Sequence, residues 1–389
     1  MKVNLGLGAH NSKDWARFSA GRFDEKPVVS DHEIIEAVLA LGDLAEPLGF
    51  DGIWAPEHSG TPYGMTPNPL QLLTYFAART EALSLGTMVA VVPWWHPVRL
   101  AHQIAYLDIV SNGRYKVIGL GRGVAKSEFD SVSVPREEAR ERFDETIDIL
   151  ELAFTQERFE YQGKIFKIPE MSLRPRYKSE DLATRFHGAS STGPSLEKNA
   201  RRGLTPLFVG NKPIIEAGEE VKKVNTLRRE VGLPPCQPKN VLFTYCTPTM
   251  EAAKVAQTFI DDANSDVSLH YGFGDPANFA GVKGYESYAK RESYATAVTS
   301  TPEKRKSPGY DESNLLIGTP DVIIERISAC QKACSFSEVT IIPNFGTMTI
   351  PQAEASLRLF AREVLPVVHK MNAPLHASVL PDAQLVAKA

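Results

Sequence analysis

GFDGIWAPEH, residues 49–58, is a short apolar run that ends in a carboxylate beside an imidazole. An amphipathic helical pattern precedes it over residues 31–48, and a second one follows over 68–82. A strand between two helices predicts a parallel β/α unit, because a parallel neighbour is reached only through a crossover connection. Glu57 and His58 are then expected at the carboxyl end of the strand, where parallel α/β proteins place their binding sites.

The same alternation of short apolar runs and longer amphipathic runs continues along most of the chain. We expect strands at residues 3–7, 52–55, 85–92, 115–119, 185–189, 206–209, 240–245 and 338–342. We expect helices at residues 31–48, 68–82, 97–111, 135–155, 195–202, 213–231, 249–263, 320–335 and 351–372. Eight strands separated by helices predict an α/β fold of the closed (β/α)8 TIM-barrel type, and an open doubly wound sheet is the alternative.

Two long connections interrupt this alternation. We expect a single TIM-barrel domain over residues 1–389, with one insertion at about 156–184 that contains a small hairpin. The other insertion, at about 264–315, is rich in glycine, tyrosine and charged residues. A connection of that length in a compact domain indicates a lid-like or binding segment.

The composition excludes several classes of protein. A net charge of −4 without a long basic run argues against nucleic-acid binding. No apolar run is long enough to span a bilayer, and Met1 leads directly into a strand pattern, so neither a membrane nor a signal peptide is expected. The four cysteines are too few for a disulfide framework and indicate buried thiols in a reducing compartment. The chain is therefore expected to be cytoplasmic.

Chemically active side chains follow four of the predicted strands. They are Glu57 and His58 after the second strand, Trp94, Trp95 and His96 after the third, Arg122 after the fourth, and Ser190, Ser191, Thr192 and Ser195 after the fifth. An arginine in a glycine-rich turn and hydroxyl groups at a helix N-terminus together predict an anion site that suits a phosphate. The exposed N–H groups and the helix dipole favour negative charge, and the guanidinium can bind bidentately.

Simpler interpretations compete for the same residues. Gly119, Gly121 and Gly123 lack the later glycine of a dinucleotide fingerprint, which disfavours a Rossmann site. A metal site would need a ligand cluster, but the helical spacing of His96 and His102 turns them apart, and no metal is expected. Trp94 and Trp95 point to opposite faces if the strand continues, so only one of them is expected to line a pocket.

A set of short motifs extends along the whole chain. They occupy residues 49–54, 57–58, 80–87, 93, 96–99, 107–114, 121–123, 318–320 and 360–366. Together they resemble the pattern of the luciferase-like, flavin-dependent monooxygenases, the relatives of the α chain of bacterial luciferase. The resemblance covers nearly the whole chain except residues 264–315.

The resemblance implies roles for individual positions. His58 is similar to the family's active-site histidine, which lies beside the reactive edge of the flavin. Met88 and Val89 fall where many members have a non-prolyl cis peptide bond against the isoalloxazine. Arg122 is similar to the phosphate-binding arginine, with Ser191, Thr192 and Ser195 as its hydroxyl partners, and Trp94 or Trp95 is a wall of the substrate pocket. Ser59 and Gly121 depart from luciferase, which argues against light emission and its aldehyde substrate.

The resemblance also implies an activity. We expect a monooxygenase that uses reduced FMN and O2 to oxygenate a small apolar organic substrate through a flavin hydroperoxide or peroxide, by Baeyer–Villiger insertion, epoxidation or hydroxylation. No second nucleotide domain is present in the sequence, so a separate NAD(P)H-dependent flavin reductase is expected as a partner, and relatives indicate a homodimer. Three alternatives stay open: a deazaflavin-dependent dehydrogenase of the same fold, a non-catalytic flavin-binding paralogue, and a metal-dependent hydrolase that uses Glu57 and His58.

Overall fold

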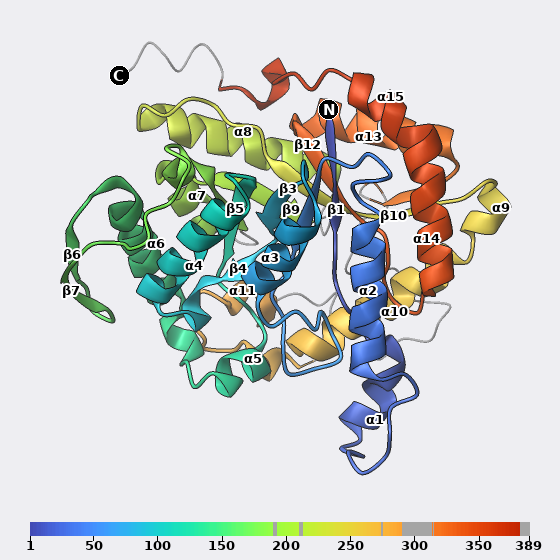
Figure 1. Cartoon of the computed structure of the whole chain (residues 1–389), viewed down its shortest axis with the longest axis horizontal. Helices are drawn as coiled ribbons and strands as arrows, with labels where there is room; N and C mark the ends of the chain where they lie inside the picture. The colour runs from blue at the N-terminus through green and yellow to red at the C-terminus, as the bar shows by residue number, and fades with distance from the viewer. Residues whose placement is uncertain (190–192, 210–212, 274, 290–312, 314, 382–389) are drawn as a thin grey trace.

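The chain forms a closed parallel barrel surrounded by helices. The computed structural model describes residues 1–189, 193–209, 213–273, 275–289, 313 and 315–381 (Figure 1). The barrel strands are β1 (Lys2–Gly6), β2 (Gly52–Ala55), β3 (Ser84–Thr87), β5 (Tyr115–Gly121), β8 (Phe186–Ala189), β9 (Thr205–Val209), β10 (Lys239–Cys246) and β12 (Glu338–Ile342). Each pairs in parallel with two neighbours, and the circle closes because β10 pairs with both β9 and β12 while β12 also pairs with β1. The predicted TIM barrel is confirmed, and the open sheet is excluded.

The helices cover the outside of the barrel. The main ones are α2 (Asp31–Asp43), α3 (Pro69–Arg79), α4 (Pro97–Val110), α6 (Ala139–Thr155), α7 (Gly193–Arg201), α8 (Ile214–Glu230), α10 (Ala256–Tyr271), α13 (Pro320–Cys334), α14 (Ile350–Leu359) and α15 (Leu365–Lys370). Their starts follow from local sequence: Ser30 and Glu33 form a capping box at α2, and Asn68 accepts a hydrogen bond from the Gln71 backbone before Pro69 at α3. None of the described helices is both long and apolar enough to cross a membrane.

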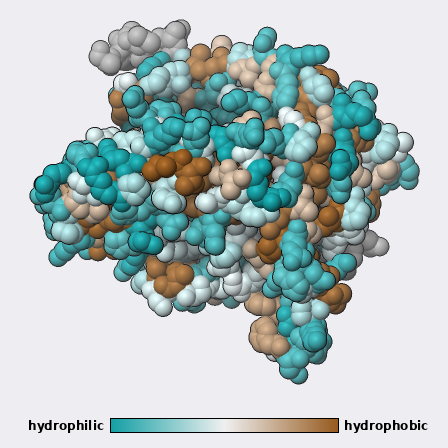
Figure 2. Space-filling view, in the orientation of Figure 1, coloured by the Kyte–Doolittle hydropathy of each residue, from teal (hydrophilic) through white to brown (hydrophobic). Residues whose placement is uncertain are grey.

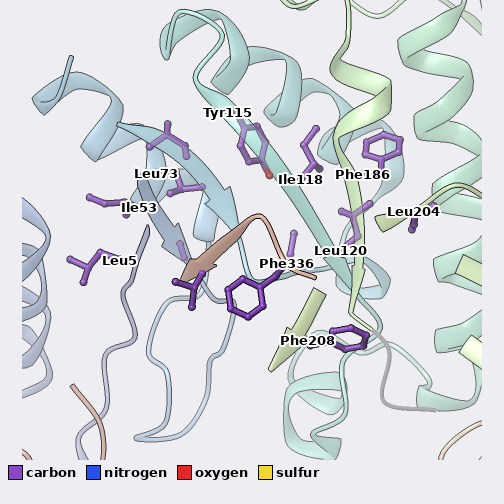
Figure 3. Close-up of a cluster of buried hydrophobic side chains, with 14 of the residues drawn as sticks. Leu5, Ile53, Leu73, Tyr115, Ile118, Leu120, Phe186, Leu204, Phe208 and Phe336 are labelled. Atoms are coloured by element: carbon purple, nitrogen blue, oxygen red, sulfur yellow. The ribbon is translucent and has the colours of Figure 1, made fainter. Parts of the chain in front are cut away.

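The core lies mainly between the strands and the helices. Leu5, Ile53, Ile118 and Leu120 are fully buried on the strands, and Phe336 packs among the same buried side chains (Figure 3). A second cluster, which includes Trp54, Val241 and Phe243, also draws on barrel strands. The face drawn in Figure 2 is mostly hydrophilic, with small separate hydrophobic areas.

The long helix α10 and two short helices, α5 (Lys126–Ser131) and α11 (Glu286–Ala289), lie at the carboxyl end of the barrel. In Figure 1 they lie below the strands, away from the N-terminus where β1 starts. The other short elements are α1 (Trp15–Ser19), α9 (Met250–Ala253), and the antiparallel pair β6 (Phe159–Gln162) and β7 (Lys167–Met171), which lies within residues 156–184.

Several elements differ from the sequence-based expectation: helices α1, α5 and α11 were not expected, and the helix expected at 351–372 is divided into α14 and α15 by a π-helical turn (Phe360–Val364). The expected strand 85–92 is divided into β3 and β4 (Ala90–Val91), with a register shift at Leu85 and Gly86 and a cis peptide bond between Met88 and Val89. Strand β11 (Leu316–Gly318), which pairs with β10, was not predicted. The helix expected at 249–263 is divided into α9 and α10, and α10 continues to Tyr271, so residues 264–271 belong to α10 and not to the second connection.

Candidate functional site

A cavity of about 180 Å³, here called the first cavity, opens at the carboxyl end of the barrel. Its walls come from the ends of β2, β5, β8 and β9, from the break between β3 and β4, and from α5, α6 and α7. Of the predicted site residues, it brings together His58, Met88, Val89, Trp94, Arg122 and Ser195. Ser191 and Thr192 lie outside the described residues. The imidazole of His58 and the guanidinium of Arg122 therefore line the same cavity.

Arg122 is held at the cavity wall by the segment that contains Gly284 and Tyr285. Its Nη2 donates a hydrogen bond to the Gly284 carbonyl at 2.8 Å, and its Cζ lies 4.5 Å from the centre of the Tyr285 ring. Its Nη1 is buried and has no hydrogen-bond partner among the described residues. A buried guanidinium nitrogen without a partner is costly, so this atom fits an anionic ligand in the cavity.

Arg140, on α6, is a second guanidinium at the same wall. Its Nη2 donates to Ser195 Oγ at 3.2 Å, and its pKa is lowered by burial and by the like charge of Arg122. Lys198 also lines the cavity and forms an ion pair with Asp144. Two adjacent guanidiniums favour an anion with more than one negative charge, such as a phosphate monoester. The sequence did not single out Arg140, because it lies in a helix with several other charged residues.

His58 is oriented by a buried carboxylate. Its Nδ1 lies 3.1 Å from Glu128 Oε1, which also accepts a hydrogen bond from the Ser59 backbone at 3.0 Å. Burial alone would raise the pKa of Glu128, but hydrogen bonding to His270 and His58 outweighs it and lowers the pKa to about 2. Glu128 is therefore an ionised acceptor, so the His58 Nδ1–H donates to it. In the neutral ring Nε2 is then an acceptor, 3.3 Å from the Tyr271 hydroxyl.

A second imidazole lies on the other side of Glu128. His270 Nε2 lies 3.3 Å from Glu128 Oε2, and its Nδ1 lies 2.7 Å from Thr61 Oγ1. One ligand atom from each of His58, Glu128 and His270 lies within 4.8 Å of the others, a composition that can also hold a metal ion. Glu128 Oε1 is shared by two donors, whereas the contact between Glu128 Oε2 and His270 Nε2 lacks hydrogen-bond geometry. Neither Glu128 nor His270 was predicted, since they come from helices far apart in the sequence.

Glu57, the neighbour of His58, makes structural contacts. Its carboxylate accepts hydrogen bonds from the Val91 backbone at 2.5 Å and from Trp95 Nε1 at 2.9 Å. Trp95 therefore points away from the first cavity, whereas Trp94 lines it and packs edge-on against Phe129 with 5.7 Å between ring centres. The two tryptophans do not lie in a strand as expected: Trp94 ends a short 3-10 helix (Val92–Trp94) and Trp95 follows it. Glu57 and His58 both line the first cavity.

Glu57 makes the free energy of unfolding depend on pH. Burial raises its pKa from 4.5 to about 8, against the lowering effect of its two hydrogen bonds. Between these values the unfolded chain loses this proton and the folded chain keeps it, so stability falls as pH rises. We expect Glu57→Gln to reduce the difference in Tm between pH 5 and pH 8 by a few degrees. The control is Glu36→Gln, at an exposed position on α2. An unchanged pH dependence in Glu57→Gln would contradict this assignment.

Comparison with known proteins gives the family. The profile described as luciferase-like monooxygenase matches residues 18–335. The chain belongs to this family. It is 23% identical over 366 residues to the alkanal monooxygenase alpha chain of the Kryptophanaron alfredi symbiont, covering 90% of this chain and 97% of that one. It is 24% identical over 344 residues to the oxygenase component of the flavin-dependent trigonelline monooxygenase of Acinetobacter baylyi, covering 86% and 90%. An uncharacterized protein of Sinorhizobium fredii is 34% identical over only 38% of this chain and 42% of its own length.

Solved structures of this luciferase-like monooxygenase fold include enzymes of two kinds. The monooxygenase RslO1 from Streptomyces bottropensis superimposes with a TM-score of 0.72 and 25% identity, over 95% of this chain and all of that one. An F420-dependent secondary alcohol dehydrogenase superimposes with a TM-score of 0.66 and 13% identity, over 94% and 98%. The second likeness concerns the fold alone.

Proposed function

We propose that this protein is the oxygenase of a two-component system, which uses reduced FMN and O2 to oxygenate a small apolar organic substrate. The observation that carries the proposal is the shared cavity, which is lined both by the two guanidiniums of Arg122 and Arg140 and by the oriented His58. The buried Nη1 of Arg122, which has no hydrogen-bond partner among the described residues, can donate a hydrogen bond to a phosphate oxygen. The names of the curated relatives favour a flavin monooxygenase, and one of them is an oxygenase component.

Each part of the cavity then has a task. Arg122, Arg140 and Ser195 would hold the phosphate of FMN, and the break at Met88 and Val89 would form the floor of the ring site. When bound, reduced FMN supplies the two electrons that activate O2, so that one oxygen atom enters the substrate and the other leaves as water.

The chain contributes proton handling and shielding. His58 Nε2 accepts a hydrogen bond and can hold a proton where the two cavities meet, while Glu128 fixes the tautomer that leaves this atom available. Trp94, Val91 and Leu207 give the first cavity apolar walls that limit the entry of water. A separate NAD(P)H-dependent flavin reductase would supply the reduced cofactor, and we propose a homodimer in the cytoplasm.

A deazaflavin-dependent dehydrogenase is the second candidate, since an F420 enzyme has the same fold. Anaerobic titration of the purified protein with reduced FMN and with reduced F420 separates the two. We expect reduced FMN to bind more tightly, and we expect the FMN complex to consume O2 after mixing with aerated buffer. Incorporation of one ¹⁸O atom from ¹⁸O2 into an oxidised substrate would identify a monooxygenase. Preference for F420 with hydride transfer and no O2 uptake would contradict the proposal.

A further inference from the structure

A second cavity, of about 150 Å³, adjoins the first one at the carboxyl end of the barrel. His58, Met88, Val209 and Tyr271 line both cavities, so the second begins where the imidazole of His58 ends the first. No residue of the second cavity was predicted from the sequence except His58 and Met88. Its position places whatever it binds beside the atom that we assign to proton handling.

One wall of the second cavity is apolar. Val241 and Phe243 come from β10, Ile342 comes from β12, and Phe345 follows β12. The rings of Phe243 and Phe345 pack edge-to-face with 5.2 Å between their centres, which fixes this wall. An apolar cavity of about 150 Å³ admits one benzene molecule. The space therefore suits a molecule about the size of one six-membered ring.

The second cavity also has polar groups, and among them His10 offers a hydrogen-bond donor. The Gly64 backbone N–H donates to His10 Nδ1 at 3.1 Å, so the neutral ring carries its proton on Nε2. Burial and the neighbouring His58 and His270 lower the pKa of His10 to about 3, which keeps the ring neutral at ordinary pH. Nε2 has no hydrogen-bond partner in the part of the chain that the structure describes. The lack of a side chain at Gly8 leaves room for the His10 ring, because a Cβ atom at position 8 would lie only 2.8 Å from His10 Nε2.

The second cavity offers no fixed charge that would attract an anion. None of the described residues that line it is a lysine or an arginine. Its one carboxyl group, Asp266, accepts a hydrogen bond from Ser12, and burial raises its pKa to about 7. A carboxylate ligand would therefore lose its water without gaining a counter-ion, which is unfavourable in a buried site.

We infer that the second cavity is the substrate subsite, and that it takes a neutral molecule of about one six-membered ring with a hydrogen-bond acceptor that faces His10 Nε2. The acceptor is a carbonyl oxygen or a ring nitrogen. This inference rests on the proposed oxygenase function, because it calls the ligand a substrate. Binding of a ligand to the second cavity, however, does not require flavin and can be measured on the chain alone.

The test is ligand-observed NMR on the full chain without flavin. Cyclohexanone is compared with methylenecyclohexane, which has nearly the same shape but no strong acceptor, and pyridine tests a ring nitrogen. We expect the acceptor ligands to bind about tenfold more tightly than methylenecyclohexane, the effect of one buried hydrogen bond. His10→Phe should remove this difference in affinity. Val241→Phe should weaken the binding of all three ligands, because the larger side chain fills the second cavity.

Two further ligands test size and charge. Cyclohexanecarboxylate and n-decanal are both expected to bind at least tenfold more weakly than cyclohexanone. Equal binding of cyclohexanone and methylenecyclohexane to the unmodified chain would overturn the role of His10, whether or not the variants fold. Tighter binding of decanal or of the carboxylate would overturn the assigned substrate class. Reduced FMN titrated into the same samples distinguishes these failures from failure of the proposed function, since His10 and Val241 do not line the first cavity.

Discussion

His58→Ala is expected to lower product formation by about 10²- to 10⁴-fold, the range for loss of a positioned acid–base group. His58, which follows β2, lines both cavities, and the alanine of the variant has no group that can replace its imidazole. Binding of reduced FMN should change little, because the proposed phosphate contacts come from Arg122, Arg140 and Ser195 and not from His58. Single-turnover product analysis and an anaerobic FMN titration measure the two effects separately.

Two variants control for this result. His102→Ala removes an imidazole on α4 that interacts with the Val98 carbonyl outside the site, and it should leave product formation unchanged. Glu128→Gln keeps the size of the side chain but not the charge that fixes the His58 tautomer. It should lower kcat with little change in reduced-FMN affinity, as expected of a positioning residue. Full product formation in His58→Ala would remove His58 from the mechanism.

Arg122→Ala is expected to weaken reduced-FMN binding by about 10- to 100-fold, the effect of one charge-assisted hydrogen bond. Arg140→Ala should have a smaller effect, of about tenfold or less, because Arg140 already donates to Ser195. The matched control is Arg142→Ala, two residues further along α6, where the side chain pairs with Glu138. Fluorescence titration under anaerobic conditions gives the affinities.

Reduced riboflavin makes this measurement specific to the phosphate. It carries the same ring and ribityl chain but no phosphate. Arg122→Ala should therefore bind reduced riboflavin with the same affinity as the unmodified chain does. If the affinity for riboflavin fell as much as the affinity for FMN, the substitution would have disturbed the cavity as a whole, through the loss of the contacts of Arg122 with Gly284 and Tyr285. Unchanged FMN affinity in Arg122→Ala would show that the phosphate assignment is wrong.

The barrel could be predicted because its signal is periodic. Apolar runs of strand length between amphipathic helices placed each barrel strand within about two residues at most ends, apart from the divided third strand. The three residues of β11 are too short to produce such a signal. The end of α10 was missed because residues 264–271 were assigned to the glycine-rich connection that follows, although Gly272 provides an ordinary left-handed helix end.

The site could be predicted only where strand ends supply it. His58 and Arg122 follow β2 and β5, and the rule that selects strand ends found both. The same rule applies to His10, which follows β1, but it was not applied to that strand. Glu128, Arg140 and His270 lie on helices, where their charge looks like that of any solvated face. The packing of α5 and α6 over the barrel brings Glu128 and Arg140 to the first cavity, and the packing of α10 places His270 beside Glu128.

The pairing of β1 with β12 has a consequence for the synthesis of the protein. Lys2 of β1 lies opposite Glu338 of β12, so the sheet closes only after β12 has left the ribosome. Until then, one side of β1 and one side of β10 expose unpaired backbone groups, which makes the nascent chain prone to edge-to-edge aggregation. Chaperones that shield such edges until β12 is in place are therefore expected to raise the yield of the folded barrel.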